Sequence, residues 1–195
     1  MIQAVDIFWT FQGEGFNSGE RALFVRLPFC NLKCSWCDTE FNKFNNYSDE
    51  EFLGLALSEK SRFAVITGGE PTMSKNFKPV YDLLKSKDFK IAVESNGTFP
   101  IPVGDYYLTV SPKREQDVPY YIHDSAFIGA SEFKYVVDDD FDFNVLNRHK
   151  SNEQKLYLSP EFNDITKNLE KIFNYIKENP QWKISLQTHK WMNIK

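Results

Sequence analysis

Three cysteines lie together in one short segment of the chain. Cys30, Cys34 and Cys37 follow the spacing C-x3-C-x2-C, and the sequence contains no other cysteine. Three thiolates in one loop can each hold one iron of a cubane iron–sulfur cluster, which leaves the fourth iron free to bind a small molecule. Iron–sulfur proteins that only carry electrons usually supply four cysteines. The segment therefore predicts a cluster with one open coordination position.

Zinc binding and simple core packing are the alternatives for these thiols. A structural zinc site takes four ligands, and His123, His149 and His189 lie far from the cysteines in sequence, although folding could bring one of them close. Cysteines that only pack in a core are rarely spaced so tightly. Three clustered cysteines without an export signal also argue against a disulfide framework and favour a reducing, cytoplasmic compartment.

A second segment suited to chemistry is Thr67-Gly68-Gly69-Glu70-Pro71. The glycines allow the backbone to approach a ligand closely, and the Glu70 carboxylate can accept hydrogen bonds from an ammonium group. Gly-Gly-Glu-Pro alone is equally typical of a turn. Its place some thirty residues after the cysteines makes a combined site the stronger interpretation.

The elements that must position these segments are short strands separated by polar or helical stretches. Runs of β-branched and aromatic residues predict seven strands, several of them apolar throughout, as in a parallel sheet that is buried on both faces. These strands are Ala22–Leu27, Phe63–Thr67, Lys90–Ser95, Tyr106–Ser111, Glu132–Val137, Lys155–Ser159 and Lys183–Gln187.

Helix signals are fewer. A capping box begins at Ser48 and predicts a helix to about Ser58. An apolar stripe over residues 165–176, stopped by Pro180, predicts a second helix, and a weaker pattern covers Phe77–Ser86. The stretch from Glu115 to Ala130 has so few signals that we expect a helix common in barrels to be missing there.

Seven strands and three helices in 195 residues predict an α/β fold, an open and incomplete (β/α) barrel of mainly parallel strands with few helices. A complete eight-fold barrel usually needs ~250 residues. We expect one domain over residues 1–195. Most motifs follow directly after a predicted strand, so we expect the site at the C-terminal ends of the strands.

Composition and charge narrow the classes of ligand. The net charge is -4, with 42% hydrophobic and 26% charged residues, which is the balance of a soluble globular protein. No segment approaches the roughly 18 uncharged apolar residues of a membrane span. Coating a nucleic acid requires a basic face that neutralises phosphates, and this chain is mildly acidic. We therefore expect a small-molecule ligand, and neither a nucleic acid nor a membrane as partner.

The cysteine segment followed by Gly-Gly-Glu-Pro resembles the radical S-adenosylmethionine (SAM) superfamily, in which the open iron of a [4Fe-4S] cluster binds the amino and carboxylate groups of SAM. Further blocks, from about residue 7 to 190, resemble one family within it, the 7-carboxy-7-deazaguanine synthases. They are Phe11-Gln12-Gly13-Glu14-Gly15, Phe24-Val25-Arg26, Cys37-Asp38-Thr39, Glu94-Ser95-Asn96-Gly97-Thr98, Ser111-Pro112-Lys113 and Gln187-Thr188-His189-Lys190.

The resemblance implies a reaction and its cofactors. Members of this family convert 6-carboxy-5,6,7,8-tetrahydropterin into 7-carboxy-7-deazaguanine with loss of ammonia. This carbon–nitrogen lyase reaction leads to 7-deazapurine bases such as queuosine. The implied cofactors are a [4Fe-4S] cluster, SAM and Mg2+, and the cofactors rather than the protein carry the radical chemistry. An external electron donor of the flavodoxin or ferredoxin type and a homodimer are also implied.

The resemblance assigns residues of this sequence to each ligand. The cluster would take Cys30, Cys34 and Cys37, and Mg2+ would take Thr39, whose hard oxygen suits a hard cation. The residues implied for SAM are Trp36, Cys37, Asp38, Gly69, Glu70, Glu94, Ser95, Asn96, Ser111, Pro112 and Lys113. Those implied for the pterin substrate are Phe11, Gln12, Gly13, Glu14, Arg26, Thr67, Gln187 and His189.

The sequence alone leaves two other functions open. A glycyl-radical activase is also a small radical SAM enzyme, but it has no need of the Gln12-Gly13-Glu14 block, Arg26 or Thr39. An electron carrier or structural metal protein would share the cysteines, and SAM would not perturb its cluster. The sequence also departs from the family pattern at Pro28-Phe29, where a small residue or glycine is expected before Cys30.

Overall fold

The computed structural model describes residues 1–35, 37, 39–115, 118–149 and 154–194. In these ranges the main sheet has eight strands: β2 Asp6–Phe11, β3 Arg21–Leu27, β5 Phe63–Gly68, β6 Lys90–Ser95, β7 Tyr107–Val110, β10 Glu132–Val137, β11 Lys155–Pro160 and β12 Trp182–Ile184. Their order across the sheet is β12-β11-β10-β7-β6-β5-β3-β2. All neighbours are parallel except β2 and β3, which are antiparallel.

Two short antiparallel pairs lie beside this sheet. The first joins β1 (Ile2–Ala4) to β4 (Asn45–Tyr47), and the second joins β8 (Arg114–Glu115) to β9 (Val118–Pro119). The parallel strands of the main sheet are the seven that the sequence predicts. The last is shorter than expected, because the chain leaves the sheet after Ile184 and turns toward the open side of the barrel.

The edge strand β2 was not expected. Its sequence, Asp-Ile-Phe-Trp-Thr-Phe, mixes buried and half-exposed positions, as an edge strand with one free side does. It pairs antiparallel with β3, and this pairing stacks Phe8 on Phe24 with ring centroids 5.6 Å apart. The loop between the two strands carries the Gln12-Gly13-Glu14 block, so β2 fixes where that block begins.

Three helices confirm the sequence signals: α1 (Asp49–Ala56), α2 (Phe77–Lys85) and α4 (Ile165–Glu178). The expectation of no helix between Glu115 and Ala130 was wrong, because α3 spans Asp124–Gly129. Its N-cap is His123, whose ring nitrogen accepts a hydrogen bond from the Ser125 backbone at 3.2 Å. Histidine is not among the preferred capping residues, so the position that caps the helix carried no start signal.

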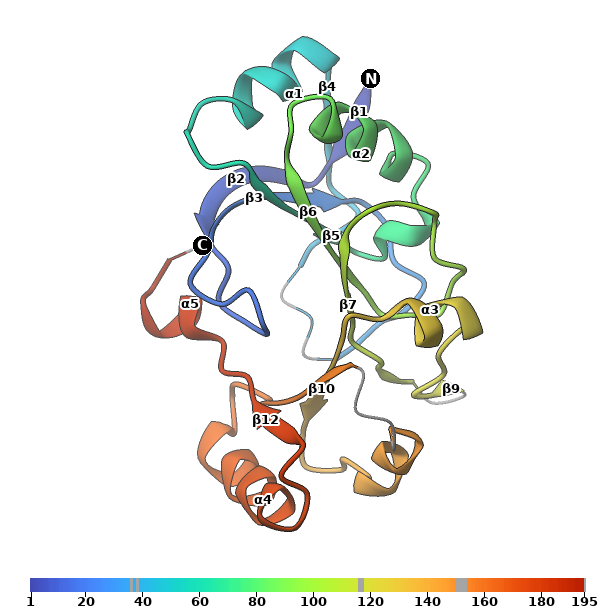
Figure 1. Ribbon diagram of the computed structural model, residues 1–195, viewed down its shortest axis with the longest axis vertical. Coiled ribbons are helices and arrows are strands. Elements are labelled where there is room, and N and C mark those ends of the chain that lie inside the picture. Colours follow the sequence, from blue (N-terminus) through green and yellow to red (C-terminus); the bar gives the residue numbers. More distant parts are fainter. Residues whose placement is uncertain (36, 38, 116–117, 150–153, 195) are drawn as a thin grey trace.

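The remaining helical elements are α5 (Thr188–Trp191) and two 3-10 helices, Pro71–Met73 and Phe143–Arg148. Figure 1 shows α1 to α4 around the outside of the curved sheet and α5, with the C-terminus, on the opposite side. No helix in the described ranges combines the length and the apolar character that crossing a bilayer requires.

Side chains alternate between the two faces of the strands, as the period of a β-strand dictates. On β3, Leu23, Val25 and Leu27 point toward the helices and belong to the main hydrophobic core. Ala22 and Phe24 point to the inner side, where they form a smaller apolar cluster with Val65 and Ala92. This inner cluster fills the barrel interior toward the N-terminal ends of β3, β5 and β6.

One residue pair further along each strand, the inner positions become polar. The register aligns Arg26 with Thr67, and Thr109 with both Glu94 and Glu132. The Thr67 hydroxyl completes the row by donating to the Glu94 carboxylate at 3.0 Å. A continuous row of polar groups therefore crosses the inner face beside the apolar cluster. It lies near the C-terminal ends of β3, β5 and β6 and reaches the first residue of β10.

The capping box of α1 gives a direct test of the local sequence signal. The Glu51 backbone donates to the Ser48 hydroxyl at 3.1 Å, and the Glu51 carboxylate accepts from the Ser48 backbone at 2.7 Å. Ser48→Ala should lower the free energy of unfolding by about 1 kcal/mol in urea denaturation. Glu51→Gln keeps an acceptor and should cost less. Activity should not change, since α1 lies outside the barrel, and an unaltered unfolding midpoint in Ser48→Ala would contradict the assignment.

Candidate active site

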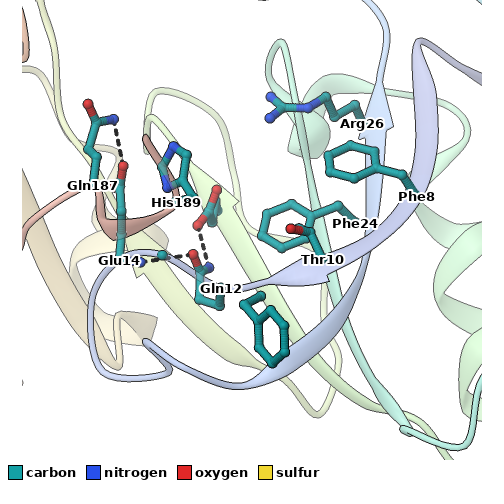
Figure 2. A pocket seen from close by; sticks show the side chains of 11 residues that line it. Phe8, Thr10, Gln12, Glu14, Phe24, Arg26, Gln187 and His189 are labelled. Carbon is teal, nitrogen blue, oxygen red and sulfur yellow. Dashed lines mark hydrogen bonds between the residues drawn. The ribbon is translucent and has the colours of Figure 1, made fainter. Parts of the chain in front are cut away.

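Two cavities open at the inner face of the sheet, and Arg26 and Glu94 line both of them. The first cavity, drawn in Figure 2, contains every residue expected to bind the substrate except Thr67. The second contains all three cysteines together with Thr39 and Thr67. It also contains many of the residues expected to bind SAM, namely Cys37, Gly69, Glu94, Ser95, Asn96, Ser111 and Lys113.

The cysteine loop enters the second cavity under a tight backbone constraint. Phe29 has φ 68°, in the left-handed region that favours glycine, which explains why a small residue was expected before Cys30. A Cβ on Gly69 would lie 1.8 Å from the Phe29 carbonyl oxygen, so glycine at 69 is required for this close approach. The Glu70 backbone donates to that same oxygen at 2.8 Å and fastens the loop to the end of β5.

The three thiols fit an iron–sulfur cluster. Cys30, Cys34 and Cys37 line one cavity, and the Leu32 backbone donates to the Cys30 sulfur at 3.4 Å, as backbone groups do to cluster ligands. In the part of the chain described here, no three His, Cys, Asp or Glu side chains converge as ligands of a single ion do. Thiols spread around one cavity suit a cluster that takes one thiolate per iron. Burial raises the pKa of Cys30 to about 11 in the protein alone, so cluster binding must displace its proton.

Glu70 lies beneath the cavity rather than in its wall. Its carboxylate is 0% exposed and accepts four hydrogen bonds, from the backbone and hydroxyl of Thr72, the hydroxyl of Ser95 and the backbone of Asn96. Burial raises the pKa of Glu70 despite these bonds. In the structure this carboxylate fixes Ser95 and Asn96, and its contact with an ammonium group stays a prediction.

The block after β6 supports the cysteine loop directly. The Asn96 amide donates to the Asn31 side chain at 3.0 Å, and the Asn31 amide in turn donates to the Thr98 hydroxyl at 3.0 Å. Asn31 adjoins Cys30 in sequence. Asn96, which is expected to bind SAM, therefore also holds the loop that carries the cysteines.

Lys113 brings a positive charge to the second cavity. Its ammonium donates to the Ser111 carbonyl oxygen at 2.8 Å. Burial, and then the neighbouring ammonium of Lys134, lower the pKa of Lys113 to about 8. Pro112 is buried but does not line either cavity. Trp36 and Asp38 lie outside the described residues.

Arg26 and Thr39 meet where the two cavities join. The Arg26 guanidinium donates to the Thr39 hydroxyl at 3.0 Å, and it lies over the Phe8 ring at 5.6 Å from the centroid. Figure 2 shows Arg26 above Phe8 and Phe24 at one end of the first cavity.

The opposite end of the first cavity is built by residues from both ends of the chain. Gln12 donates to Glu94 at 2.9 Å and accepts from the Glu14 backbone at 3.1 Å. The Gln187 amide donates to the Glu14 carboxylate at 2.6 Å. Glu14 therefore sits between the loop after β2 and the segment after β12.

Lys134 is the main charged partner of Glu14. Its ammonium donates to the second carboxylate oxygen of Glu14, and both side chains are largely buried. Burial alone would raise the pKa of Glu14. The Lys134 ammonium and the hydrogen bonds from Lys134 and Gln187 outweigh that effect and lower the pKa to about 2. The carboxylate is therefore ionised throughout the neutral range.

The C-terminal segment packs directly on Gly13. The Thr188 backbone and hydroxyl donate to the Gly13 carbonyl oxygen at 3.1 and 2.9 Å. A Cβ on Gly13 would lie only 2.2 Å from the Nδ1 atom of His189. The absence of a side chain at Gly13 is thus what allows the His189 ring to enter the first cavity.

Sequence reasoning missed several residues of the site. Phe8 and Phe24 form an apolar wall of the first cavity, and Thr10 lines it beside them. Lys134 lines the second cavity, and Glu132 lies on the same face of β10. A signal for the last two was present, since Glu132 and Lys134 alternate with Phe133 and Tyr135 in a strand that reads as buried. Charged residues at alternate positions of a buried strand indicate a polar interior.

Comparisons with known proteins agree with this geometry. Residues 24–103 match the model of the radical SAM superfamily. A 7-carboxy-7-deazaguanine synthase from Haemophilus influenzae is 37% identical, over 97% of this chain and 92% of that protein. One from Neisseria meningitidis is 35% identical, with the same coverage of both proteins. The chain belongs to the 7-carboxy-7-deazaguanine synthase family.

A solved structure supports this membership. The crystal structure of QueE from Escherichia coli superposes with a TM-score of 0.78 at 26% identity and covers 95% of this chain and 93% of that one. The expected fold, a partial barrel with few helices, is therefore confirmed. As a member of the 7-carboxy-7-deazaguanine synthase family the chain is a radical SAM enzyme of the lyase type, and the superfamily implies a [4Fe-4S] cluster and SAM as cofactors.

Gly13 provides a test of the contact between the two ends of the chain. Gly13→Ala should displace His189 and the segment after β12, and should lower kcat/KM for the substrate by about tenfold to a hundredfold. The melting temperature should change little, because the displaced segment is short. Steady-state kinetics and thermal unfolding of the loaded enzyme measure both effects.

Gly54 supplies the matched control. It lies in the exposed middle of α1, and a Cβ there would meet nothing within 4 Å. Gly54→Ala should leave kcat/KM unchanged and stabilise the protein by roughly 0.5–1 kcal/mol. Wild-type kcat/KM in Gly13→Ala would show that the contact with His189 does not matter.

Proposed function

We propose that this protein converts 6-carboxy-5,6,7,8-tetrahydropterin into 7-carboxy-7-deazaguanine, with loss of ammonia, in the biosynthesis of 7-deazapurines such as queuosine. The observation that carries this proposal is that the cysteine cavity and the cavity of Figure 2 share Arg26 and Glu94. A molecule in the first cavity would then lie directly beside a molecule bound at the cysteines.

The chemistry of the first cavity suits a carboxylated pterin. Arg26 is a planar, permanently charged donor that can pair with the substrate carboxylate. Phe8 and Phe24 offer ring faces on the apolar side. At the far end, the ionised Glu14 carboxylate can accept hydrogen bonds from the N–H groups of an aminopyrimidine edge, and Gln12 can both donate and accept there.

We assign His189, Gln187 and the Gly13 backbone to the same substrate, because they line the cavity next to Glu14. Phe11 lines the cavity from β2, and Thr67 is assigned through its place in the polar row beside Arg26. These residues bind and orient the pterin. The C-terminal segment that carries His189 covers one side of the cavity and helps to exclude water from it.

For SAM we assign the polar end of the second cavity. Ser95, Asn96 and Ser111 offer hydroxyl and amide groups, and Lys113 offers an ammonium that can pair with the SAM carboxylate. Gly69 and Glu94 lie in the same wall, and Glu70 holds Ser95 and Asn96 in place. When bound, the cluster and SAM supply the radical that removes a hydrogen atom from the substrate.

A magnesium ion is part of the proposal. Thr39 lines the second cavity beside Arg26, and its hydroxyl oxygen is the kind of ligand that a hard cation prefers. Thr39 would help to hold the ion, and the ion would supply positive charge to neutralise the substrate carboxylate. Thr39→Val removes the oxygen at constant shape and should raise the Mg2+ concentration for half-maximal activity about tenfold, measured by titration of the chelated enzyme. An unchanged Mg2+ requirement would remove Thr39 from the metal site.

The proposal extends to the setting of the enzyme. We infer a single radical SAM domain, a homodimer, a cytoplasmic location and an external electron donor of the flavodoxin or ferredoxin type. The clustered free thiols support a cytoplasmic location, because exposed cysteines such as Cys37 are readily oxidised in oxidising compartments. Size-exclusion chromatography with light scattering tests the dimer.

The loop that holds the cluster is tested by Cys34→Ala. With only two thiolates left, the anaerobically reconstituted variant should lose the visible absorbance of the cluster and all turnover. Measured iron and sulfide contents, the absorbance spectrum and product formation check this outcome. Circular dichroism should remain that of the wild type, and normal activity in the variant would overturn the cluster assignment.

The reaction itself is tested in one anaerobic assay. The reconstituted protein receives reductant, SAM, Mg2+ and 6-carboxytetrahydropterin, and mass spectrometry follows 7-carboxy-7-deazaguanine and 5′-deoxyadenosine. Product that requires SAM supports the proposal. Formation of 5′-deoxyadenosine without product would refute the substrate and favour another small radical SAM enzyme, such as an activase. Neither compound from a fully loaded cluster would favour an electron carrier.

A further inference from the structure

Strand β10 carries two charged side chains on the inner face of the barrel, Glu132 and Lys134, and neither belongs to a motif recognised in the sequence. Glu132 is 2% exposed and Lys134 is 7% exposed. A lysine so deeply buried is unusual unless it is paired. Both side chains lie beneath the loop of residues 12–20, which joins β2 to β3.

Lys134 and Gln187 hold the Glu14 carboxylate from two sides. Lys134 donates to its Oε2 atom, while Gln187 donates to its Oε1 atom at 2.6 Å. The side chains of Lys134 and Glu14 are 9% and 13% exposed, so water screens their attraction only weakly. Each carboxylate oxygen keeps a second lone pair for a ligand in the first cavity.

Glu132 anchors the loop on the other side of Glu14. Its carboxylate accepts hydrogen bonds at 3.0 Å from the Phe16 backbone, the Tyr107 hydroxyl and the Thr109 hydroxyl. The Gly15 backbone donates to the Ser185 hydroxyl at 2.8 Å. The backbone that follows Glu14 is thus fixed to the sheet, and Lys134 fixes its side chain.

We propose that Lys134 is a positioning residue that keeps Glu14 ionised and aimed into the substrate cavity. This inference rests on the proposed function, in which Glu14 accepts hydrogen bonds from the aminopyrimidine edge. A buried ion pair adds little net stability compared with an apolar pair, so stability is a weak reason for placing this lysine here. Its effect on the acceptor that faces the ligand is the stronger reason.

The surrounding charges show in which direction the loss of Lys134 would shift the pKa of Glu14. The Glu14–Lys134 pair is faced by Glu94 from β6, Glu132 from β10, Lys113 after β7 and His189 from α5. Without the Lys134 ammonium, burial and the nearby carboxylates raise the pKa of Glu14. A protonated Glu14 would present a donor where the substrate presents donors.

The pH dependence of KM tests this role. In Lys134→Met, Glu14 should take up a proton as the pH falls below its raised pKa. The ratio of the variant KM to the wild-type KM should then grow by about tenfold per pH unit, while kcat changes far less. Lys134→Arg restores the cation and should return the ratio close to one at every pH from 6 to 8.5.

Lys177→Met is the matched control. Lys177 is exposed in the last turn of α4, outside the barrel, and its removal should leave KM unchanged across the same pH range. A ratio for Lys134→Met that is raised but independent of pH would show a merely structural role and overturn the proposal. A ratio of one would do the same.

A second readout keeps this inference separate from the reaction. Carbon-13 NMR of glutamate-labelled protein, with the Glu14 carboxyl signal assigned by its loss in Glu14→Gln, reports ionisation directly. The signal should stay that of a carboxylate down to pH 5 in the wild type and titrate near neutral pH in Lys134→Met. An ionised Glu14 at pH 6 in Lys134→Met would overturn the role of Lys134, whereas failure of the wild type to form 7-carboxy-7-deazaguanine would refute only the proposed reaction.

Discussion

The register of the parallel strands is the constraint on which the site depends. It aligns Arg26 with Thr67, and Thr109 with Glu94 and Glu132, in one row of inner positions. A shift of one residue in any of these strands would turn its polar group toward the helices and bring an apolar side chain inside. The apolar cluster of Ala22, Phe24, Val65 and Ala92 just below the row stabilises that register.

Two segments near the ends of the chain pack on this polar row and complete the first cavity. The loop after β2 is held by Glu94, Glu132 and Lys134, and the segment after β12 is held by that loop through Gly13 and Glu14. The C-terminal segment is therefore the last layer of a stack that begins at the sheet. Each layer is held by hydrogen bonds to the one below. A substitution in β10 should therefore displace residues that line the cavity beside the C-terminal segment.

A second stack supports the cysteines. Glu70 is buried and holds Ser95 and Asn96, Asn96 holds Asn31, and Asn31 adjoins Cys30. Glu70 of the Gly-Gly-Glu-Pro motif thus supports two residues that line the second cavity. Arg26 and Glu94 line both cavities, so the same two side chains form part of both walls.

Much of this could be predicted from sequence because the signals are local. The apolar runs of the parallel strands, the capping box at Ser48 and the cysteine spacing each depend on neighbouring residues alone. The sequence did not predict the edge strand β2, because its pairing with β3 across the intervening loop is a tertiary contact. It did not predict α3, because His123 is an unusual N-cap. The family blocks predicted many of the residues that line the two cavities, and only the tertiary structure showed which residues line a cavity and which support them from below. Lys134 meets Glu14 across 120 residues and Gln187 meets it across 173, and no local pattern encodes a contact that exists only after the barrel has brought its strands together.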